Sequence, residues 1–134
     1  MNYSDWKKIV FTEIKTDITW KIQAYRLSLF LADLAWNDCS IITENHKFSL
    51  SDQLYRSVGS ISANIVEGYS RISNKEKARF YEISLGSTRE ARDWYFKSRH
   101  LFTSELIRSR IKLLTSIIKL LQVMITDRRK ASRI

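Results

Sequence analysis

The chain has 134 residues, of which 44% are hydrophobic and 28% charged, a balance typical of one folded domain rather than a disordered or fibrous chain. It contains no proline and only three glycines, so few positions interrupt a helix. The net charge of +9 arises in the second half: residues 1–70 hold seven Lys/Arg against eight Asp/Glu, whereas residues 71–134 hold sixteen against six. This asymmetry favours a polyanion or an acidic protein as partner.

The first of four segments with helical periodicity runs from about residue 16 to residue 38. Its apolar stripe consists of Trp20, Ala24, Leu27, Leu31, Leu34 and Ala35. The preceding extension, residues 1–15, contains Trp6 and either continues this helix or folds back on it. Residues 40–48 are expected to form the first loop.

The second helix is expected to begin with Ser49 or Ser51 as its cap and to end near Gly68. Its stripe consists of Leu50, Leu54, Val58, Ile61 and Ile65. Ser73 or Asn74 should cap the third helix. One face of that helix carries Phe80, Ile83, Ser87, Ala91, Trp94 and Leu101. We assign Trp94, in preference to Tyr95, to the core.

The fourth helix follows a turn near residues 102–104 and carries two apolar stripes. The first consists of Ile107, Ile111, Leu114, Ile118, Leu121 and Ile125, and the second of Leu106, Leu113, Ile117, Leu120 and Met124. A single bundle needs only one stripe per helix, so the second predicts a subunit interface. The expected fold is an all-α, antiparallel up-down-up-down four-helix bundle over residues 16–126. Residues 127–134 form a basic tail, either a flexible phosphate-binding arm or a solubilising end.

No segment carries a recognisable catalytic motif. The histidines, His46 and His100, lie in different contexts and are expected to be solvated or capping, and no Glu-x-x-His motif for a di-iron site is present. Cys39 is the only cysteine and is expected to be a small buried hydrophobe. We therefore expect a protein that is not an enzyme and that holds neither metal nor cofactor. With no secretory signal and no apolar run approaching the roughly 20 residues of a membrane span, a cytoplasmic location is expected.

A polar stripe accompanies the apolar one on the second helix. Arg56, Ser60, Asn64, Glu67 and Arg71 recur at intervals of three and four residues. Such a stripe is either a solvated face or a buried seam in which Ser60 and Asn64 bond to a neighbouring helix. Small neighbouring residues favour the seam over either the solvated face or a ligand-binding role.

Basic and aromatic side chains alternate on the third helix, a mixture that can contact phosphates and stack on bases. At helical spacing, however, aromatic residues are more often core than nucleobase platforms. The predicted nucleic-acid contacts are Arg89, Arg92, Lys97, Arg99, Arg128, Arg129 and Lys130.

The segments GSISANIVEGYSR (residues 59–71) and KARFYEISLGSTREARDWYFKSRHLF (residues 77–102) resemble the four-helix-bundle family named for the 23S ribosomal RNA intervening-sequence protein. The resemblance covers roughly residues 18–126. Its hallmark positions are Ser60, Ile61, Asn64, Ile65, Glu67 and Gly68, followed by Arg79, Phe80, Leu85, Gly86 and Ser87. Ser62 stands where many members have proline, which should leave the helix straighter.

The resemblance implies a homopentameric barrel of bundles. It also implies a role like that of a relative that serves as accessory protein to the reverse transcriptase of diversity-generating retroelements. We therefore predict a non-catalytic homo-oligomer that binds RNA or DNA through a basic surface, with no membrane partner. The rival prediction is a scaffold that docks an acidic protein.

Overall fold

A computed structural model of the chain describes residues 1–133, and the regular structure within them is entirely helical, with no strand. The expected all-α class is therefore confirmed. The helices are α1 (Tyr3–Ile9), α2 (Thr12–Lys15), α3 (Gln23–Glu44), α4 (Phe48–Tyr69), α5 (Asn74–Lys97) and α6 (Ser104–Ser132), with 3-10 turns at Ile18–Lys21 and Arg99–Leu101. Within the described part of the chain, no helix is both long and apolar enough to cross a membrane.

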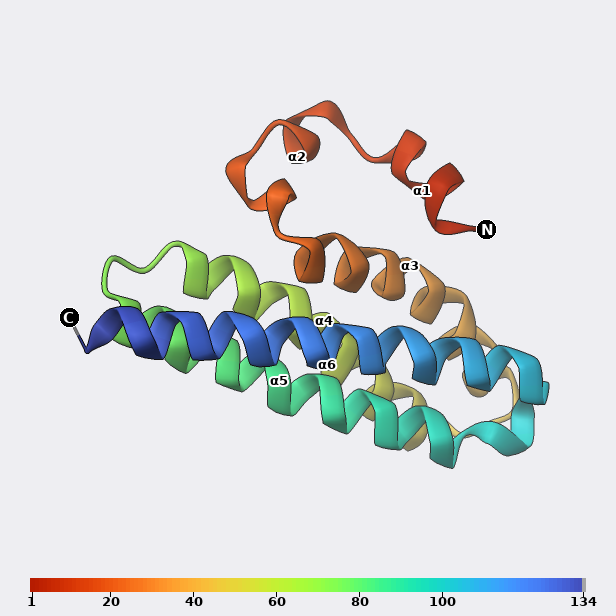
Figure 1. The fold of residues 1–134 in the computed structure, drawn as a ribbon. Helices are drawn as coiled ribbons and strands as arrows, with labels where there is room; N and C mark the ends of the chain where they lie inside the picture. Colours follow the sequence, from red (N-terminus) through yellow and green to blue (C-terminus); the bar gives the residue numbers. More distant parts are fainter. Residues whose placement is uncertain (134) are drawn as a thin grey trace.

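The four long helices, α3 to α6, lie side by side, and successive helices run in opposite directions (Figure 1). α4 packs against α3 and α5, while α6 packs against α5 and α3. The side chains between them exclude water almost completely; the most buried include Leu31, Ile42, Leu54, Ile61, Ile65, Leu114, Ile117 and Leu121. Burial of apolar surface, at about 25 cal/mol per Å², is the main term that holds these helices together.

The helix starts follow local hydrogen-bonding chemistry in two of the long helices. The Ser73 hydroxyl accepts the Glu76 amide at 3.1 Å, which confirms the expected cap of α5, and Thr103 caps α6 in the same way. The expected caps of α4 are wrong, because α4 begins at Phe48 without a side-chain cap. Ser51 is instead buried, where its hydroxyl donates to the Cys39 carbonyl at 3.1 Å.

The first connection is shorter than the sequence predicts. α3 continues to Glu44, which leaves only residues 45–47 between α3 and α4. Ile42 explains the difference, since its side chain is fully buried in the core and extends the apolar face of α3 by a turn. His46 lies in the resulting tight connection with a φ of 61°.

The buried face of α5 is the least predictable part of the core. Tyr95 is 0% exposed and Ile83 is 41% exposed, whereas the sequence pattern favoured Ile83 and Trp94 as core residues. Two small polar residues occupy the centre of the true buried face: Ser84 donates to the Ile61 carbonyl of α4 at 2.8 Å, and Thr88 donates to the Ser84 carbonyl at 2.7 Å. Because both hydroxyls are satisfied, they can face the core without a desolvation penalty.

The N-terminal extension folds back over α3 instead of continuing it (Figure 1). Trp6 is 2% exposed, and its indole N–H donates to the Asp33 carboxylate of α3 at 2.6 Å. Its ring packs against those of Tyr3, Trp20 and Phe30. The first long helix consequently begins at Gln23 and not near residue 16.

The basic C-terminal segment is largely helical. Residues 127–132 continue α6, so over this range the segment is not a separate arm. The final residue of the predicted tail, 134, lies outside the described residues. The second apolar stripe of α6 also packs within the chain, with Ile117 fully buried and Leu106, Leu113, Leu120 and Met124 partly buried against the core. The subunit interface predicted from this stripe stays a prediction.

Candidate nucleic-acid interface

A row of cations runs along the outer face of α6. Arg108, Lys112, Lys119, Lys130 and Arg133 follow one another at intervals of four, seven, eleven and three residues, which a period of 3.6 places on one side of a helix. All five are exposed, and none forms an ion pair with a carboxylate among residues 1–133. Of these residues, only Lys130 belongs to the set predicted from the sequence. The helical spacing was the signal that could have identified the others.

A depression between α5 and α6 lies beside this row. Its lining consists of Arg89, Arg92, Asp93, Phe96 and Ile111. Arg92 is held in place, since its guanidinium donates to the Thr115 hydroxyl of α6 at 3.2 Å. Arg89 is exposed and pairs with no carboxylate in the described part of the chain, and the Phe96 ring is 51% exposed. A charged rim beside an exposed ring can contact a phosphate and the face of a base.

Lys97 and Arg99 lie at the same end of α5 but differ in their charge partners. The Lys97 ammonium pairs with Asp93 at 2.6 Å and lies 4.5 Å from the centre of the Trp94 ring. The Arg99 guanidinium lies 4.2 Å from the centre of the Phe96 ring. Lys97 is thus partly neutralised, whereas Arg99 keeps its full charge on an aromatic support.

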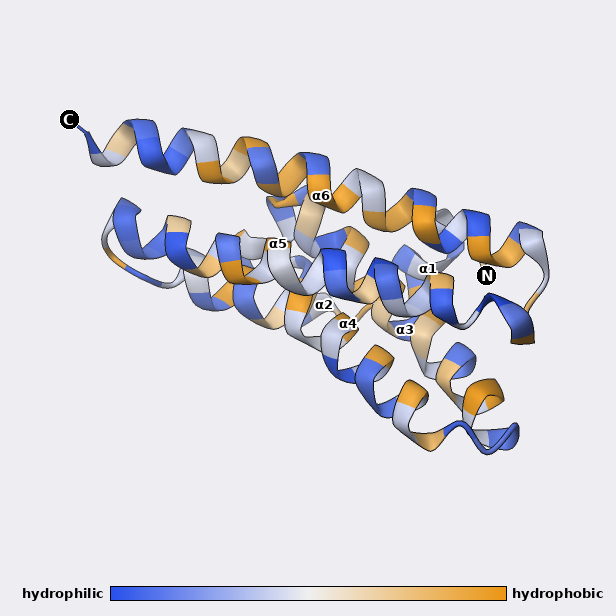
Figure 2. Cartoon of the chain, turned by 90° about the horizontal axis from the view of Figure 1, so that it is seen from below, coloured by the Kyte–Doolittle hydropathy of each residue, from blue (hydrophilic) through white to orange (hydrophobic). Residues whose placement is uncertain are grey.

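The predicted residues near the C-terminus lie apart from those on α5. Arg128 donates to the Asn74 side chain at 3.1 Å, and Arg129 pairs with Glu82, so both sit against the N-terminal half of α5. Arg129 follows Thr115, the partner of Arg92, by fourteen residues of α6. At a rise of 1.5 Å per residue, this separates the two groups by about 21 Å along the helix axis. Lys119 lies between them, so the α6 row links both ends. In Figure 2, hydrophilic residues, coloured blue, are frequent in the last turns of α6.

The hallmark polar residues form a seam between α4 and α5. The Ser87 hydroxyl donates to that of Ser60 across the two helices at 2.9 Å, and the Asn64 amide donates to the Ser60 carbonyl and hydroxyl at 2.8 and 2.9 Å. The expected seam is present for Ser60, whereas Asn64 bonds only within α4. The seam is half-buried rather than fully enclosed.

Three of the remaining hallmark residues contribute to the packing of α4. Ile61 and Ile65 are fully buried, and Gly68 permits close contact with α5, because a Cβ there would lie 2.9 Å from Phe80 Cβ. Glu67 pairs with Arg71 and Glu76 with Arg79, with the Phe80 ring 4.7 Å from the Arg71 guanidinium and 4.6 Å from that of Arg79. Gly86 differs from Gly68, since nothing lies within 4 Å of the position where its Cβ would be.

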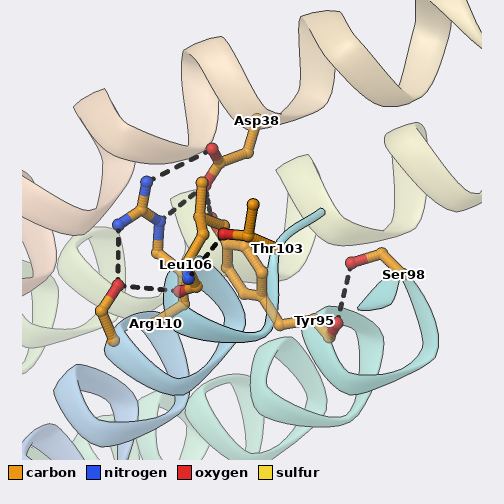
Figure 3. Close-up of polar contacts among 7 residues, drawn as sticks. Asp38, Tyr95, Ser98, Thr103, Leu106 and Arg110 are labelled. Carbon is orange, nitrogen blue, oxygen red and sulfur yellow. Dashed lines mark hydrogen bonds and ion pairs between the residues drawn. The ribbon is translucent and has the colours of Figure 1, made fainter. Parts of the chain in front are cut away.

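A buried polar cluster that sequence reasoning missed joins α3, α5 and α6 (Figure 3). The Asp38 carboxylate accepts the Tyr95 hydroxyl at 2.7 Å and pairs with the Arg110 guanidinium at 2.7 Å. Burial, reinforced by the charge of Asp38, raises the pKa of the Tyr95 hydroxyl well above its ordinary value. Tyr95 and Arg110 follow Asp38 by 57 and 72 positions, so helical periodicity gives no sign that the three side chains meet. The cluster joins α3, α5 and α6 through side-chain hydrogen bonds.

The described residues offer little acid–base or metal chemistry. No group of three or more His, Cys, Asp or Glu side chains within residues 1–133 could hold a metal ion. His46 and His100 are exposed and lie in separate connections. Cys39 is buried, as expected, and burial raises the pKa of its thiol to about 11. A thiol in such surroundings is a poor nucleophile at neutral pH.

These features describe a small all-helical protein with exposed cations along one face of α6. The model of the 23S rRNA-intervening sequence protein family matches residues 21–123, and the chain belongs to this family. The resemblance drawn from residues 59–102 is thereby confirmed. A crystal structure of a protein of unknown function from the S23 ribosomal protein family of Bacteroides thetaiotaomicron is similar, with a TM-score of 0.72 and 28% identity over 76% of this chain and 97% of that one. A comparison with curated proteins finds no match.

Proposed function

We propose that the protein is a non-catalytic, homo-oligomeric module that binds RNA or DNA through the outer face of α6 and the adjoining depression on α5. The supporting observation is the row Arg108, Lys112 and Lys119, three exposed cations that have no carboxylate partner among residues 1–133. Unpaired cations on one helix face release phosphate counterions without first breaking an ion pair. Such binding is largely independent of sequence.

The test measures affinity for a fluorescent single-stranded RNA and for a duplex DNA over a series of salt concentrations. Replacing Arg108, Lys112 and Lys119 together with glutamine should reduce the slope of log affinity against log salt by about 2, because each phosphate contact contributes roughly 0.7–0.9. The matched control replaces Lys21, Lys47 and Lys75, which are exposed, also have no carboxylate partner among residues 1–133, and carry the same total charge. Equal slopes in the two triple variants, or no binding by the native protein at low salt, would refute the proposal.

The family resemblance supports the assembly and partner parts of the proposal. We place α3 to α6 as an up-down-up-down bundle that forms one protomer of a homopentamer, with a reverse transcriptase as the protein partner. Light scattering gives the oligomeric mass directly, and a monomer at micromolar concentration would contradict the pentamer. Purification from the native host without nuclease would show whether a polymerase accompanies the protein.

An exposed aromatic pair favours a second candidate function, a scaffold that docks an acidic protein. Trp36 of α3 is 64% exposed and Tyr55 of α4 is 44% exposed, and their rings meet edge to face at 5.9 Å. Exposed aromatic pairs are common anchors of protein interfaces. Under this function, a protein partner survives nuclease treatment and is lost when Trp36 and Tyr55 are replaced with serine. Under the leading function, nuclease removes the bound material.

A further inference from the structure

A second concave site lies at the opposite end of α5 from the Phe96 depression. It is a cavity of about 510 Å³ between the start of α3, the end of α4, the first half of α5 and the last third of α6. Its lining consists of Ile22, Gln23, Ala24, Tyr69, Tyr81, Leu120, Val123, Met124, Asp127 and Arg128. The volume falls within the range of small-molecule sites, and the lining is mostly apolar, as such sites usually are.

Two cations lie in or beside this cavity: Arg128 belongs to its lining, and Lys77 contacts Tyr69, which also belongs to the lining. The Arg128 guanidinium donates to the Asn74 side chain at 3.1 Å, and the Lys77 ammonium donates to the Tyr69 carbonyl while lying 4.9 Å from the centre of the Tyr69 ring. Neither cation pairs with a carboxylate in the described part of the chain. Burial, and then the nearby charge of Arg128, lower the pKa of the Lys77 ammonium. Two cations that raise each other's energy are stabilised by an anion between them.

The rest of the lining fits the body of such an anion. Leu120, Val123 and Met124 present aliphatic and thioether groups from one face of α6, and Tyr69 presents a ring from α4. Met is an adaptable surface for apolar ligands. Asp127 also lines the cavity and is the one acidic side chain there, so the positive charges of Arg128 and Lys77 exceed the negative charge. This combination selects against a cationic ligand.

We propose that this cavity, which we call the Tyr69 pocket, binds a small amphiphilic anion. Its apolar body lies against Tyr69, Val123 and Met124, and its carboxylate or phosphate lies between Lys77 and Arg128. The Tyr69 pocket shares only Arg128 with the predicted nucleic-acid contacts. Lys77 belongs to the Tyr69 pocket alone.

The test compares ligands that share one apolar body and differ in charge. Titration calorimetry with decanoate, decyl phosphate, decanol and decyltrimethylammonium, each below its aggregation limit, measures the preference directly. Decanoate or decyl phosphate should bind at least about tenfold more tightly than decanol, since a charge-assisted hydrogen bond contributes that much or more. The cation should not bind. The two anions together distinguish a carboxylate site from a phosphate site.

Variants locate the binding within the protein. Lys77→Gln should weaken decanoate binding about tenfold, leave decanol binding unchanged and leave RNA affinity unchanged. Val123→Trp fills the cavity from an exposed position on α6, so it should abolish binding of both ligands without preventing folding. Arg99→Gln removes an exposed charge at the far end of α5 and serves as the matched control. Equal affinities for anion and alcohol, no binding by the native protein, or full binding by Val123→Trp would each overturn the proposal.

Discussion

The buried pair of Asp38 and Arg110 should reveal its contribution when one partner is removed. In Arg110→Met, the Asp38 side chain, which is only 3% exposed, keeps the Tyr95 hydroxyl at 2.7 Å as its single remaining partner. Breaking a buried ion pair from one side costs about 3–5 kcal/mol, because the other charge is left uncompensated. Since Asp38 loses both bonds to the guanidinium, we expect a loss of about 4 kcal/mol.

Urea unfolding followed by circular dichroism, at one fixed chain concentration, measures this loss. Arg108→Met, on the exposed face of the same helix, is the control and should change stability by no more than about 0.5 kcal/mol.

Replacing the whole cluster separates the pair from the packing. The triple variant Asp38→Leu, Tyr95→Phe and Arg110→Met removes all the polar side-chain atoms of the cluster at once. Its free energy of unfolding should lie within about 1 kcal/mol of that of the native chain. A loss below about 1 kcal/mol in Arg110→Met would show that the pair is effectively solvated.

Four further substitutions test the packing. Gly68→Ala should destabilise the protein by about 1–3 kcal/mol, since the added Cβ would lie 2.9 Å from Phe80 Cβ. Gly86→Ala has open space around the added Cβ and should stabilise the protein by up to about 1 kcal/mol. Equal effects of the two substitutions in thermal melts would contradict the close contact at Gly68. Trp6→Phe loses the bond to Asp33 and should speed proteolysis of residues 1–22, with unchanged cleavage as the contrary result. The Cys39 thiol should react with a disulfide reagent only after unfolding. Because its pKa rises from 9.0 to about 11, stability should fall as the pH increases through that interval, and Cys39→Ala should lack this part of the fall.

Much of the fold was legible in the sequence where apolar side chains alone decide the structure. Leu54, Val58, Ile61 and Ile65 recur at helical spacing, and all four are buried in α4. Apolar periodicity does not predict the buried face of α5, where Ser84 and Thr88 turn inward because backbone carbonyls accept hydrogen bonds from their hydroxyl groups. Hydropathy cannot anticipate such bonds, since they depend on the neighbouring helix as well as on the residue itself.

The candidate site was only partly predictable for a related reason. Counting charges in the second half of the chain indicated a basic surface, but it did not separate paired from unpaired cations. The sequence prediction includes Lys97 and Arg129, which both pair with carboxylates, and it omits the unpaired, exposed cations Arg108, Lys112 and Lys119 of residues 1–133. Long-range partners such as Glu82 for Arg129 become visible only when α5 and α6 are placed side by side.

The length of α6 has a geometric consequence for any nucleic acid laid along it. Arg108 and Lys130 are 22 residues apart in one uninterrupted helix, a distance of about 33 Å and close to one turn of duplex DNA. The backbone of a duplex winds away from a straight rod within a fraction of that turn, so it can meet only a few of these cations at once. A single strand can follow the rod from end to end. A single strand bound in this way would be held extended along α6, and the bases of that strand would be free to pair with another strand.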